Sequence, residues 1–448
     1  MNELRARLQQ YGQEHLLEGW DQLGEAEQRR FAEELQTLDF DQLSELYAKR
    51  NDTHAALPSR NRIAPIPVKP AGSLRETDRL FGEEALRHGL VAVLLVAGGQ
   101  GTRLGFDKPK GMFPVGPVSG ATLFQIHAEK VLALSRRYGK LVPYLVMTSP
   151  ATDADTRAFF AEQRNFGLAP EQVHFFTQGT MPALDAATGK VLLESPGKLF
   201  LSPNGHGGTL TALADSGLLA RLKSQGVEHV FYFQVDNPLV QIAEPGFVGR
   251  HIERGSEASS KVVFKERPEE KVGILALVDG KCSILEYSDM SPEMNEERAA
   301  DGTLVFRAGN PAIHLFSVPF LERVTSGDER LAFHIARKKV AHLGDPEPTD
   351  INALKFELFI FDALPLADRW LAVQTLREEE FAPLKNASGS DSLETLQAAM
   401  LALSKRWLKA TGLSMLENSE VEISPLFALD PDELRMKTIT LGPRVYLH

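Results

Sequence analysis

The chain has 448 residues, of which 43% are hydrophobic and 24% charged, and its formal net charge is −11 at pH 7. This length exceeds one ordinary hydrophobic core and predicts two or three domains. The acidic balance argues against general nucleic-acid binding, and no apolar run is long enough to span a bilayer. An anionic ligand would therefore need a pocket that is locally basic.

The first residues and the cysteine content indicate a cytoplasmic protein. Residues 1–15, MNELRARLQQYGQEH, are charged and lack the apolar core of a signal peptide. The single cysteine, Cys282, cannot form an intramolecular disulfide, which fits a reducing compartment. Its surroundings, GKCSILEY, predict a packed thiol on a strand rather than a nucleophile. We expect neither a membrane nor a nucleic-acid partner.

Residues 1–85 predict a helical N-terminal region and a connector. Over residues 4–50, apolar residues recur at helical spacing between charges, which is typical of amphipathic helices. Residues 57–73, LPSRNRIAPIPVKPAGS, are rich in proline and basic residues and predict an extended segment.

Residues 86–384 predict a central α/β domain. Buried-type strands are expected at 91–96, 144–149, 173–179 and 229–237, with helices at 122–139 and 152–164 between them. Such alternation indicates a mostly parallel sheet of Rossmann-like type. Further strands, expected at 260–265, 272–280, 282–289 and 304–318, would meander beside it.

Residues 385–448 predict a small C-terminal domain. This segment follows the loop PLKNASGSDS and contains one helical pattern. Two short strands are expected in it, VEISPL at 421–426 and RMKTITLG at 435–442.

A glycine-rich basic loop follows the first strand of the central domain. In AGGQGTRLGFDKPKG, residues 97–111, glycines at 98, 99 and 101 allow positive φ and close approach of a ligand, and basic side chains follow them. The P-loop spacing G-x-x-x-x-G-K-[ST] is absent, and the dinucleotide spacing G-x-G-x-x-G fails because Leu104 stands where glycine is required. The alternative to a phosphate site is an ordinary strand-to-helix turn.

What remains, G-G-x-G-T-R-L-G followed by P-K-G, resembles the signature of sugar-nucleotide pyrophosphorylases. The segments FFTQGTMPAL, SPNGHGGTLTAL, FQVDNPLV, ILEYSD, RAGNPAIHLFSVPFL and LREEEFAPLKN follow in order. Together they resemble the UDP-N-acetylhexosamine (UDP-N-acetylglucosamine) pyrophosphorylase branch of the uridylyltransferases over nearly the whole chain. The resemblance implies helical N-terminal, Rossmann-like central and small C-terminal parts. It also implies UTP and a sugar 1-phosphate as substrates, and a UDP-sugar and pyrophosphate as products.

The resemblance implies roles for individual residues around the nucleotide. The catalytic cations would be Arg103, Lys110 and Lys355. The nucleotide would be bound by Gly98, Gly99, Gly101, Gln178 and Gly205. Without the resemblance, Lys355 in ALKFELFIFD would be interpreted as an exposed lysine at the start of an amphipathic helix.

A magnesium ion and a sugar pocket are implied in the same way. Asp236 ends a buried strand, where ligands of parallel sheets bind, and would hold Mg²⁺ with phosphate oxygens and waters. Its alternative role is to cap a turn as an Asp-Asn pair. The sugar would be bound by His206, Gly273, Glu286 and Asn310, of which Glu286 and Asn310 also read as a strand-edge carboxylate and a turn asparagine.

One residue departs from the pattern of relatives that use N-acetylhexosamines. These typically read G-N-G-G, whereas this chain has His206 in NGHGG, and relatives that act on neutral sugars more often read G-H-G. We predict N-acetylglucosamine 1-phosphate as the sugar substrate. The alternatives are a pyrophosphorylase for glucose 1-phosphate or several sugar phosphates, and a non-catalytic sensor of sugar nucleotides.

Overall fold

The computed structural model describes residues 1–51, 57–326, 331–413 and 419–448. Two compact units emerge, and each combines stretches that are distant in the sequence. Unit 1 contains residues 1–56, 179–208 and 331–360, and unit 2 contains residues 57–178, 209–330 and 361–448. The domain boundaries expected at residues 85 and 384 remain predictions. None of the helices in the described residues is long and apolar enough to cross a membrane.

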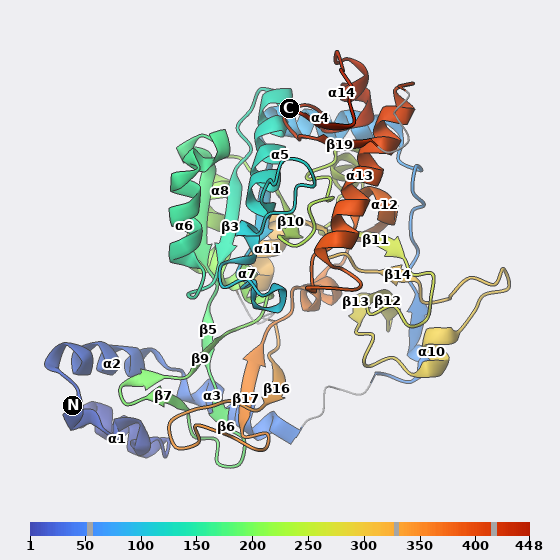
Figure 1. Cartoon of the computed structure of the whole chain (residues 1–448). Helices are drawn as coiled ribbons and strands as arrows, with labels where there is room; N and C mark the ends of the chain where they lie inside the picture. The colour runs from blue at the N-terminus through green and yellow to red at the C-terminus, as the bar shows by residue number, and fades with distance from the viewer. Residues whose placement is uncertain (52–56, 327–330, 414–418) are drawn as a thin grey trace. The chain divides into compact units, whose positions relative to one another are not determined.

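Unit 1 is built from N-terminal helices and short strands. Figure 1 shows its three stretches, coloured blue, green and orange, side by side. Its helices are α1 (Asn2–Gln10), α2 (Glu25–Thr37) and α3 (Phe40–Ala48). Its strands are β5 (Thr180–Pro182), β6 (Leu184–Asp185), β7 (Leu193–Ser195), β8 (Lys198–Leu199), β9 (Leu201–Pro203), β16 (His334–Lys338) and β17 (Ala353–Glu357). The helices expected between residues 4 and 50 are confirmed, and Phe31 and Leu35 of α2 are buried in one core with Leu354 and Phe356 of β17.

Unit 2 is organised around a mixed sheet of eleven strands. The strands run in the order β1-β12-β14-β11-β15-β10-β2-β3-β4, with β13 beside β12 and β18 beside β11. Their bounds are β1 (Ile63–Pro65), β2 (Val91–Val96), β3 (Tyr144–Thr148), β4 (Val173–Thr177), β10 (His229–Gln234), β11 (Ala258–Phe264), β12 (Ile274–Val278), β13 (Lys281–Leu285), β14 (Ala308–Gly309), β15 (His314–Ser317) and β18 (Trp370–Gln374). The pairs β10–β2, β2–β3 and β3–β4 are parallel, whereas β15 pairs antiparallel with β10 and β11. The expected α/β fold, with meandering strands beside a parallel sheet, is confirmed.

Helices cover the parallel strands because β2 is apolar on both faces. Val93 and Leu95 share a core with α5 and α9, while the alternate residue Leu94 is equally buried on the other face. The helices of this unit are α4 (Glu76–His88), α5 (Leu123–Tyr138), α6 (Asp153–Glu162), α7 (Gly208–Asp215, which starts at the last residue of unit 1), α8 (Leu218–Ser224), α9 (Pro245–Glu253), α10 (Pro292–Glu296), α11 (Val318–Thr325), α12 (Arg377–Glu380), α13 (Leu393–Ala410) and α14 (Pro431–Arg435). Helix α5 begins where the Thr122 hydroxyl accepts from the Gln125 N–H at 3.2 Å, and it ends at Gly139 with φ +67°.

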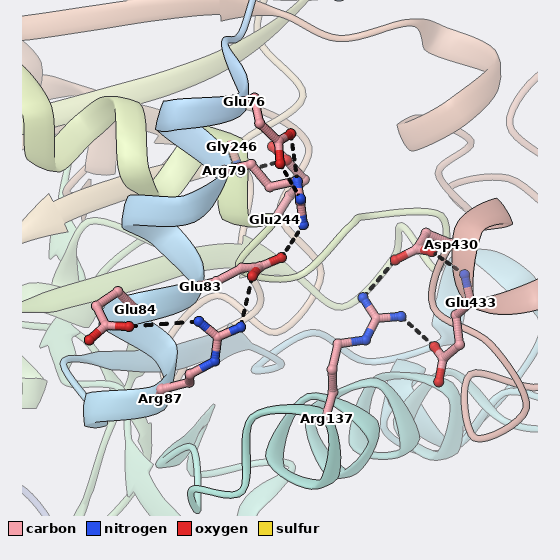
Figure 2. A network of polar contacts seen from close by, with 10 residues as sticks. All are labelled: Glu76, Arg79, Glu83, Glu84, Arg87, Arg137, Glu244, Gly246, Asp430 and Glu433. Atoms are coloured by element: carbon pink, nitrogen blue, oxygen red, sulfur yellow. Dashed lines mark hydrogen bonds and ion pairs between the residues drawn. The ribbon is translucent and has the colours of Figure 1, made fainter.

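The C-terminal segment attaches to the central layers through charged contacts. Arg137 of α5 forms ion pairs with Asp430, at 2.6 Å, and with Glu433 of α14 (Figure 2). Glu422 of β19 (Glu420–Ile423) accepts from the backbone N–H groups of Val118 and Ser119, each at 2.7 Å. The contacts of Glu422 fix the loop that follows residues 97–111.

One expected strand of this segment is wrong. The helix α13 and the strand β19 are found, but residues 438–442 of RMKTITLG form no regular element. The partner of β19 is β20 (Arg444–Leu447), a parallel strand that begins after Pro443. The Glu420 N–H donates to the Pro443 carbonyl at 2.8 Å, so the pairing starts after the proline rather than before it.

Candidate functional site

Several predicted site residues follow the parallel strands of unit 2. Gly98 comes after β2, Gln178 after β4 and Asp236 after β10, and Ser149 follows β3. Because these four strands are parallel, their carboxyl ends meet at one edge of the sheet, which is where ligands of such sheets bind. The fold therefore gathers the predicted phosphate, uracil and metal groups at a single edge.

The predicted phosphate loop closes on itself, and its arginine lies on the outside. The Gly101 N–H donates to the Lys108 carbonyl at 2.9 Å, and the Lys110 N–H donates to the Gly99 carbonyl at 3.0 Å. Arg103 lies in the 3₁₀ turn Thr102–Leu104 and is exposed. Within the described parts of the chain, its guanidinium makes no hydrogen bond or ion pair, so it is available to a ligand.

The three glycines, which allow positive φ, do not use it. Gly98, Gly99 and Gly101 all lie outside that region, and in this loop Gly105 adopts it, with φ +68°. What these glycines provide is space for neighbouring groups. A Cβ on Gly98 would lie 3.1 Å from Oε1 of Gln178, and one on Gly101 would lie 2.8 Å from Phe106, whereas one on Gly99 would meet nothing within 4 Å. Gly99 therefore presents open backbone, and its neighbour Gly98 lies beside the Gln178 amide.

Lys110 and Asp236 face each other at this edge. The Lys110 Nζ lies 4.0 Å from Oδ2 of Asp236 and donates to the Leu384 carbonyl at 3.2 Å. Both side chains are mostly buried, with exposed fractions of 19% and 13%. The two side chains are close but not hydrogen-bonded to each other. The lysine can therefore contact a phosphate, and the carboxylate can contact a cation that is bound to that phosphate.

The strand end that carries Asp236 is anchored from α5. The His127 Nε2–H donates to the Val235 carbonyl at 3.0 Å, and burial lowers the pKa of His127 to about 3, so this imidazole is neutral. The Lys130 Nζ donates to the carbonyls of Pro238 and Val240 at 2.5 and 2.7 Å. The backbone on both sides of Asp236 is thus fixed.

The donor set around Asp236 fits a magnesium ion that is shared with a substrate. Within the described residues, no group of three or more His, Cys, Asp or Glu side chains could hold a metal ion by itself. Mg²⁺ commonly binds through one or two carboxylates, with phosphate oxygens and waters completing its shell. One hard oxygen donor beside a phosphate loop matches that pattern.

The three residues of unit 2 that were predicted to bind the sugar lie together at the ends of neighbouring strands. The Asn310 N–H donates to the Gly273 carbonyl at 2.8 Å. A Cβ on Gly273 would lie 3.3 Å from Oε1 of Glu286, which follows β13. The Asn310 side chain accepts from the Ala312 N–H at 3.0 Å, so the turn role considered for this asparagine is also present.

Gly205 and His206 belong to unit 1, where they lie against residues 358–360. The Gly207 N–H donates to the Leu358 carbonyl at 2.8 Å, and Nδ1 of His206 accepts from the Ile360 N–H at 3.2 Å. A neutral imidazole in this arrangement carries its proton on Nε2. Gly205 has φ +82°, and a Cβ on it would lie 2.4 Å from the Leu358 carbonyl oxygen. The loop NGHGG is thus shaped by its own packing.

Lys355 also lies in unit 1, and the helix expected around it is wrong. Lys355 is the middle residue of strand β17, between the fully buried Leu354 and Phe356. From Leu354 to Glu357, buried and half-buried residues alternate with the period of a strand, and this strand pairs with β16 and β6. Burial lowers the pKa of Lys355 below its ordinary value, and its Nζ lies 5.3 Å from the centre of the Phe200 ring.

The sequence interpretation missed residues that hold the glycine-rich loop and the loop that carries Asp236. The Ser149 hydroxyl donates to the Gly98 carbonyl at 2.8 Å. The Leu384 N–H donates to the Asp236 carbonyl at 2.8 Å, and Asn237 donates to the Glu380 carbonyl at 2.7 Å. The signal was present, because Leu384 and Glu380 belong to the segment LREEEFAPLKN that carries part of the resemblance.

Known proteins resemble this chain in sequence and in fold. The family model described as UTP–glucose-1-phosphate uridylyltransferase matches residues 38–439. A human protein named UDP-N-acetylhexosamine pyrophosphorylase-like protein 1 is 39% identical, covering 96% of this chain and 90% of its own. The UDP-N-acetylglucosamine pyrophosphorylase of Saccharomyces cerevisiae is 38% identical, over 81% of this chain and 80% of its own. A crystal structure of the uridine diphosphate N-acetylglucosamine pyrophosphorylase from Trypanosoma brucei, in complex with inhibitor, has a TM-score of 0.82 at 28% identity and covers 99% of this chain and 97% of that one.

Proposed function

Because the chain belongs to the UTP–glucose-1-phosphate uridylyltransferase family, as its motifs predicted, we propose that it joins UTP and N-acetylglucosamine 1-phosphate into a UDP-sugar. The observation that carries this proposal is the edge of the parallel sheet in unit 2. There an open glycine loop, an available arginine and a Lys110–Asp236 pair 4.0 Å apart lie after adjacent strands. We propose the cytoplasm as its location on the strength of the sequence.

The reaction needs positioning and charge rather than a general base. An oxygen of the sugar 1-phosphate attacks the α-phosphorus of UTP, the new P–O bond forms, and pyrophosphate leaves with the electron pair of the bond that breaks. The attacking oxygen is already ionised near neutral pH. Stabilisation of charge in the transition state is therefore the main task of the protein.

Each group at the sheet edge has a task in this scheme. Arg103 binds the departing phosphates with its planar fork of N–H groups, and Lys110 neutralises charge at the α-phosphate. Gly99 admits the nucleotide, and the Gln178 amide hydrogen-bonds the edge of uracil. Asp236 would hold Mg²⁺, which supplies positive charge to the phosphate oxygens when bound.

The test is a pyrophosphate-release assay with the purified protein, UTP, Mg²⁺ and a panel of sugar 1-phosphates. We expect turnover with N-acetylglucosamine 1-phosphate. Glucose 1-phosphate is the second candidate, which the imidazole of His206 in NGHGG favours. Faster turnover of glucose 1-phosphate would reverse our choice of sugar. Binding of UDP-sugars without turnover of any substrate would instead indicate a sensor.

The base and the metal are tested with the same protein. A site that reads uracil through an amide and backbone groups leaves polar atoms unpaired with a purine, so UTP should exceed ATP in kcat/KM by about 10⁴-fold. Asp236→Asn should lower kcat by at least about 10²-fold, with partial rescue at high Mg²⁺ at best. The matched control is Asp155→Asn, an exposed carboxylate on α6. Comparable use of ATP, or an unchanged Mg²⁺ dependence in Asp236→Asn, would contradict these assignments.

A further inference from the structure

A buried ion pair lies behind the edge of the sheet that carries Asp236. Lys261 of β11 and Glu380 at the end of α12 are 2% and 3% exposed, and the Lys261 Nζ donates to Oε1 of Glu380. Oε2 of Glu244 is the next carboxylate oxygen, 3.8 Å from the same Nζ. The Thr375 hydroxyl also donates to Oε1 of Glu380, at 2.8 Å.

Glu380 connects this pair to the loop after Asp236. Its Oε2 accepts from the Gln241 N–H at 3.2 Å, and its backbone carbonyl accepts from Nδ2 of Asn237 at 2.7 Å. Oδ1 of Asn237 accepts in turn from the Ala382 N–H at 3.1 Å. One glutamate thus holds residues 237–241 through both its side chain and its backbone.

The same segment reaches the two groups proposed to act on the phosphates. The Leu384 N–H donates to the Asp236 carbonyl at 2.8 Å, and the Leu384 carbonyl accepts from the Lys110 Nζ at 3.2 Å. The path from the ion pair to Lys110 and Asp236 therefore runs along the backbone of residues 380–384 and ends in the two hydrogen bonds of Leu384. A shift of this segment would move both groups together.

A buried ion pair is a poor way to gain stability alone. Two charges lose their hydration when they are buried, and apolar residues of similar volume often stabilise a fold as well or better. What the charges add is a defined orientation, since the carboxylate of Glu380 accepts hydrogen bonds from Lys261, Thr375 and Gln241 in a single geometry. We infer that the Lys261–Glu380 pair positions Asp236 and Lys110 for uridylyl transfer, through residues 380–384. This inference rests on the function proposed above.

The first test is Glu380→Gln, which keeps the shape and removes the charge. Because misplaced groups act mainly in the transition state, kcat should fall by about 10- to 100-fold while KM for UTP changes by less than about 3-fold. Without any ligand, amide exchange of residues 380–384 should be faster, which hydrogen–deuterium exchange measures independently of catalysis. Thr375→Val removes one donor to Glu380 and should lower kcat in the same direction by about 5-fold.

A double variant separates positioning from stability. Lys261→Met with Glu380→Leu replaces both charges by apolar side chains and removes the acceptor of the Gln241 N–H. Its unfolding free energy should be close to that of the wild type, whereas its kcat should stay at least about 10-fold down. If kcat recovers together with stability, the pair is structural only and the inference is wrong.

The matched control is Asp78→Asn in the same unit. Asp78 is 1% exposed and pairs with Arg75 at 2.8 Å, but it contacts neither loop of the site. It should lower the melting temperature without changing kcat or amide exchange at residues 380–384. An unchanged kcat and unchanged exchange in folded Glu380→Gln or Thr375→Val would overturn the inference. A wild-type protein without activity would instead contradict the proposed function.

Discussion

Two loops of this chain are rich in glycine, residues 97–101 after β2 and residues 204–208 before α7, and their glycines meet different surroundings. A Cβ on Gly99 would enter open space. A Cβ on Gly205, Gly207 or Gly208 would lie 2.4 Å, 2.6 Å or 2.0 Å from atoms of the same unit. The first loop keeps room for another molecule at Gly99, although its Gly98 and Gly101 are packed against Gln178 and Phe106. The second loop is filled by the protein itself at all three glycines. Glycine content alone does not distinguish a ligand loop from a packing loop.

The largest expected effect concerns the cations of the first loop. Arg103→Ala and Lys110→Ala should each lower kcat by about 10²–10³-fold, because the lost charge acts mostly in the transition state. Since the exposed Arg103 has no partner in the described structure, its removal should change the unfolding free energy by less than about 0.5 kcal/mol. The control is Arg136→Ala, an exposed arginine on α5. If folded Arg103→Ala kept near wild-type turnover, this loop would be an ordinary strand-to-helix turn rather than a phosphate site.

Gly207→Ala should damage stability rather than chemistry. The new Cβ would lie 2.6 Å from backbone atoms of Leu358 and Phe359, which cannot rotate away. We expect a loss of about 1–3 kcal/mol in unfolding free energy, measured by denaturant titration. An unchanged stability would mean that this loop has more room than its packing indicates.

Gly99→Ala should show the opposite behaviour. Its Cβ has nothing within 4 Å, so the unfolding free energy should change by less than about 0.5 kcal/mol. If UTP approaches the backbone here, kcat/KM for UTP should fall by about 10-fold, which corresponds to about 1.4 kcal/mol. Steady-state kinetics and denaturant titration should be measured for both Gly99→Ala and Gly207→Ala. A loss of stability in Gly99→Ala together with a loss of kcat/KM alone in Gly207→Ala would refute the comparison of the two loops.

The smallest effect is expected for His206→Asn. The Nδ1 of His206 accepts from the Ile360 N–H, and a neutral imidazole in this arrangement donates only through Nε2. Asparagine has a shorter arm with both a donor and an acceptor. The kcat/KM ratio of N-acetylglucosamine 1-phosphate to glucose 1-phosphate should therefore rise by about 5-fold. An unaltered ratio would leave His206 with its anchoring role and direct attention to Asn310 and Glu286.

The regular elements were predictable where the sequence has a clear period. The strand 91–96 and the helix that begins after Thr122 appear as expected, because apolar continuity and a capping residue act locally. Lys355 shows the limit, since two buried residues around one lysine fit a short strand as well as a helix start. The partners β16 and β6, which decide between them, are distant in the sequence.

The candidate site was predictable in its types of residue but not in its support. The loop motif and the residue after β10 identify the basic loop and Asp236 directly. No local pattern indicates that the backbone of Leu384 contacts both Asp236 and Lys110, because this depends on a chain reversal more than a hundred residues later. The φ angles of Gly98 and Gly101 also could not be predicted, since a glycine can be required either for space or for positive φ.

The carboxylate of Glu422 has a consequence for how the protein is made. It accepts from the Val118 and Ser119 amides across 304 and 303 positions of sequence. A ribosome that adds about 5–20 residues per second needs about 15–60 s between synthesising the two sides. During this interval the nascent chain already carries the basic loop, while the acceptor that fixes its flank does not yet exist. This edge of the sheet is therefore completed among the last events of synthesis.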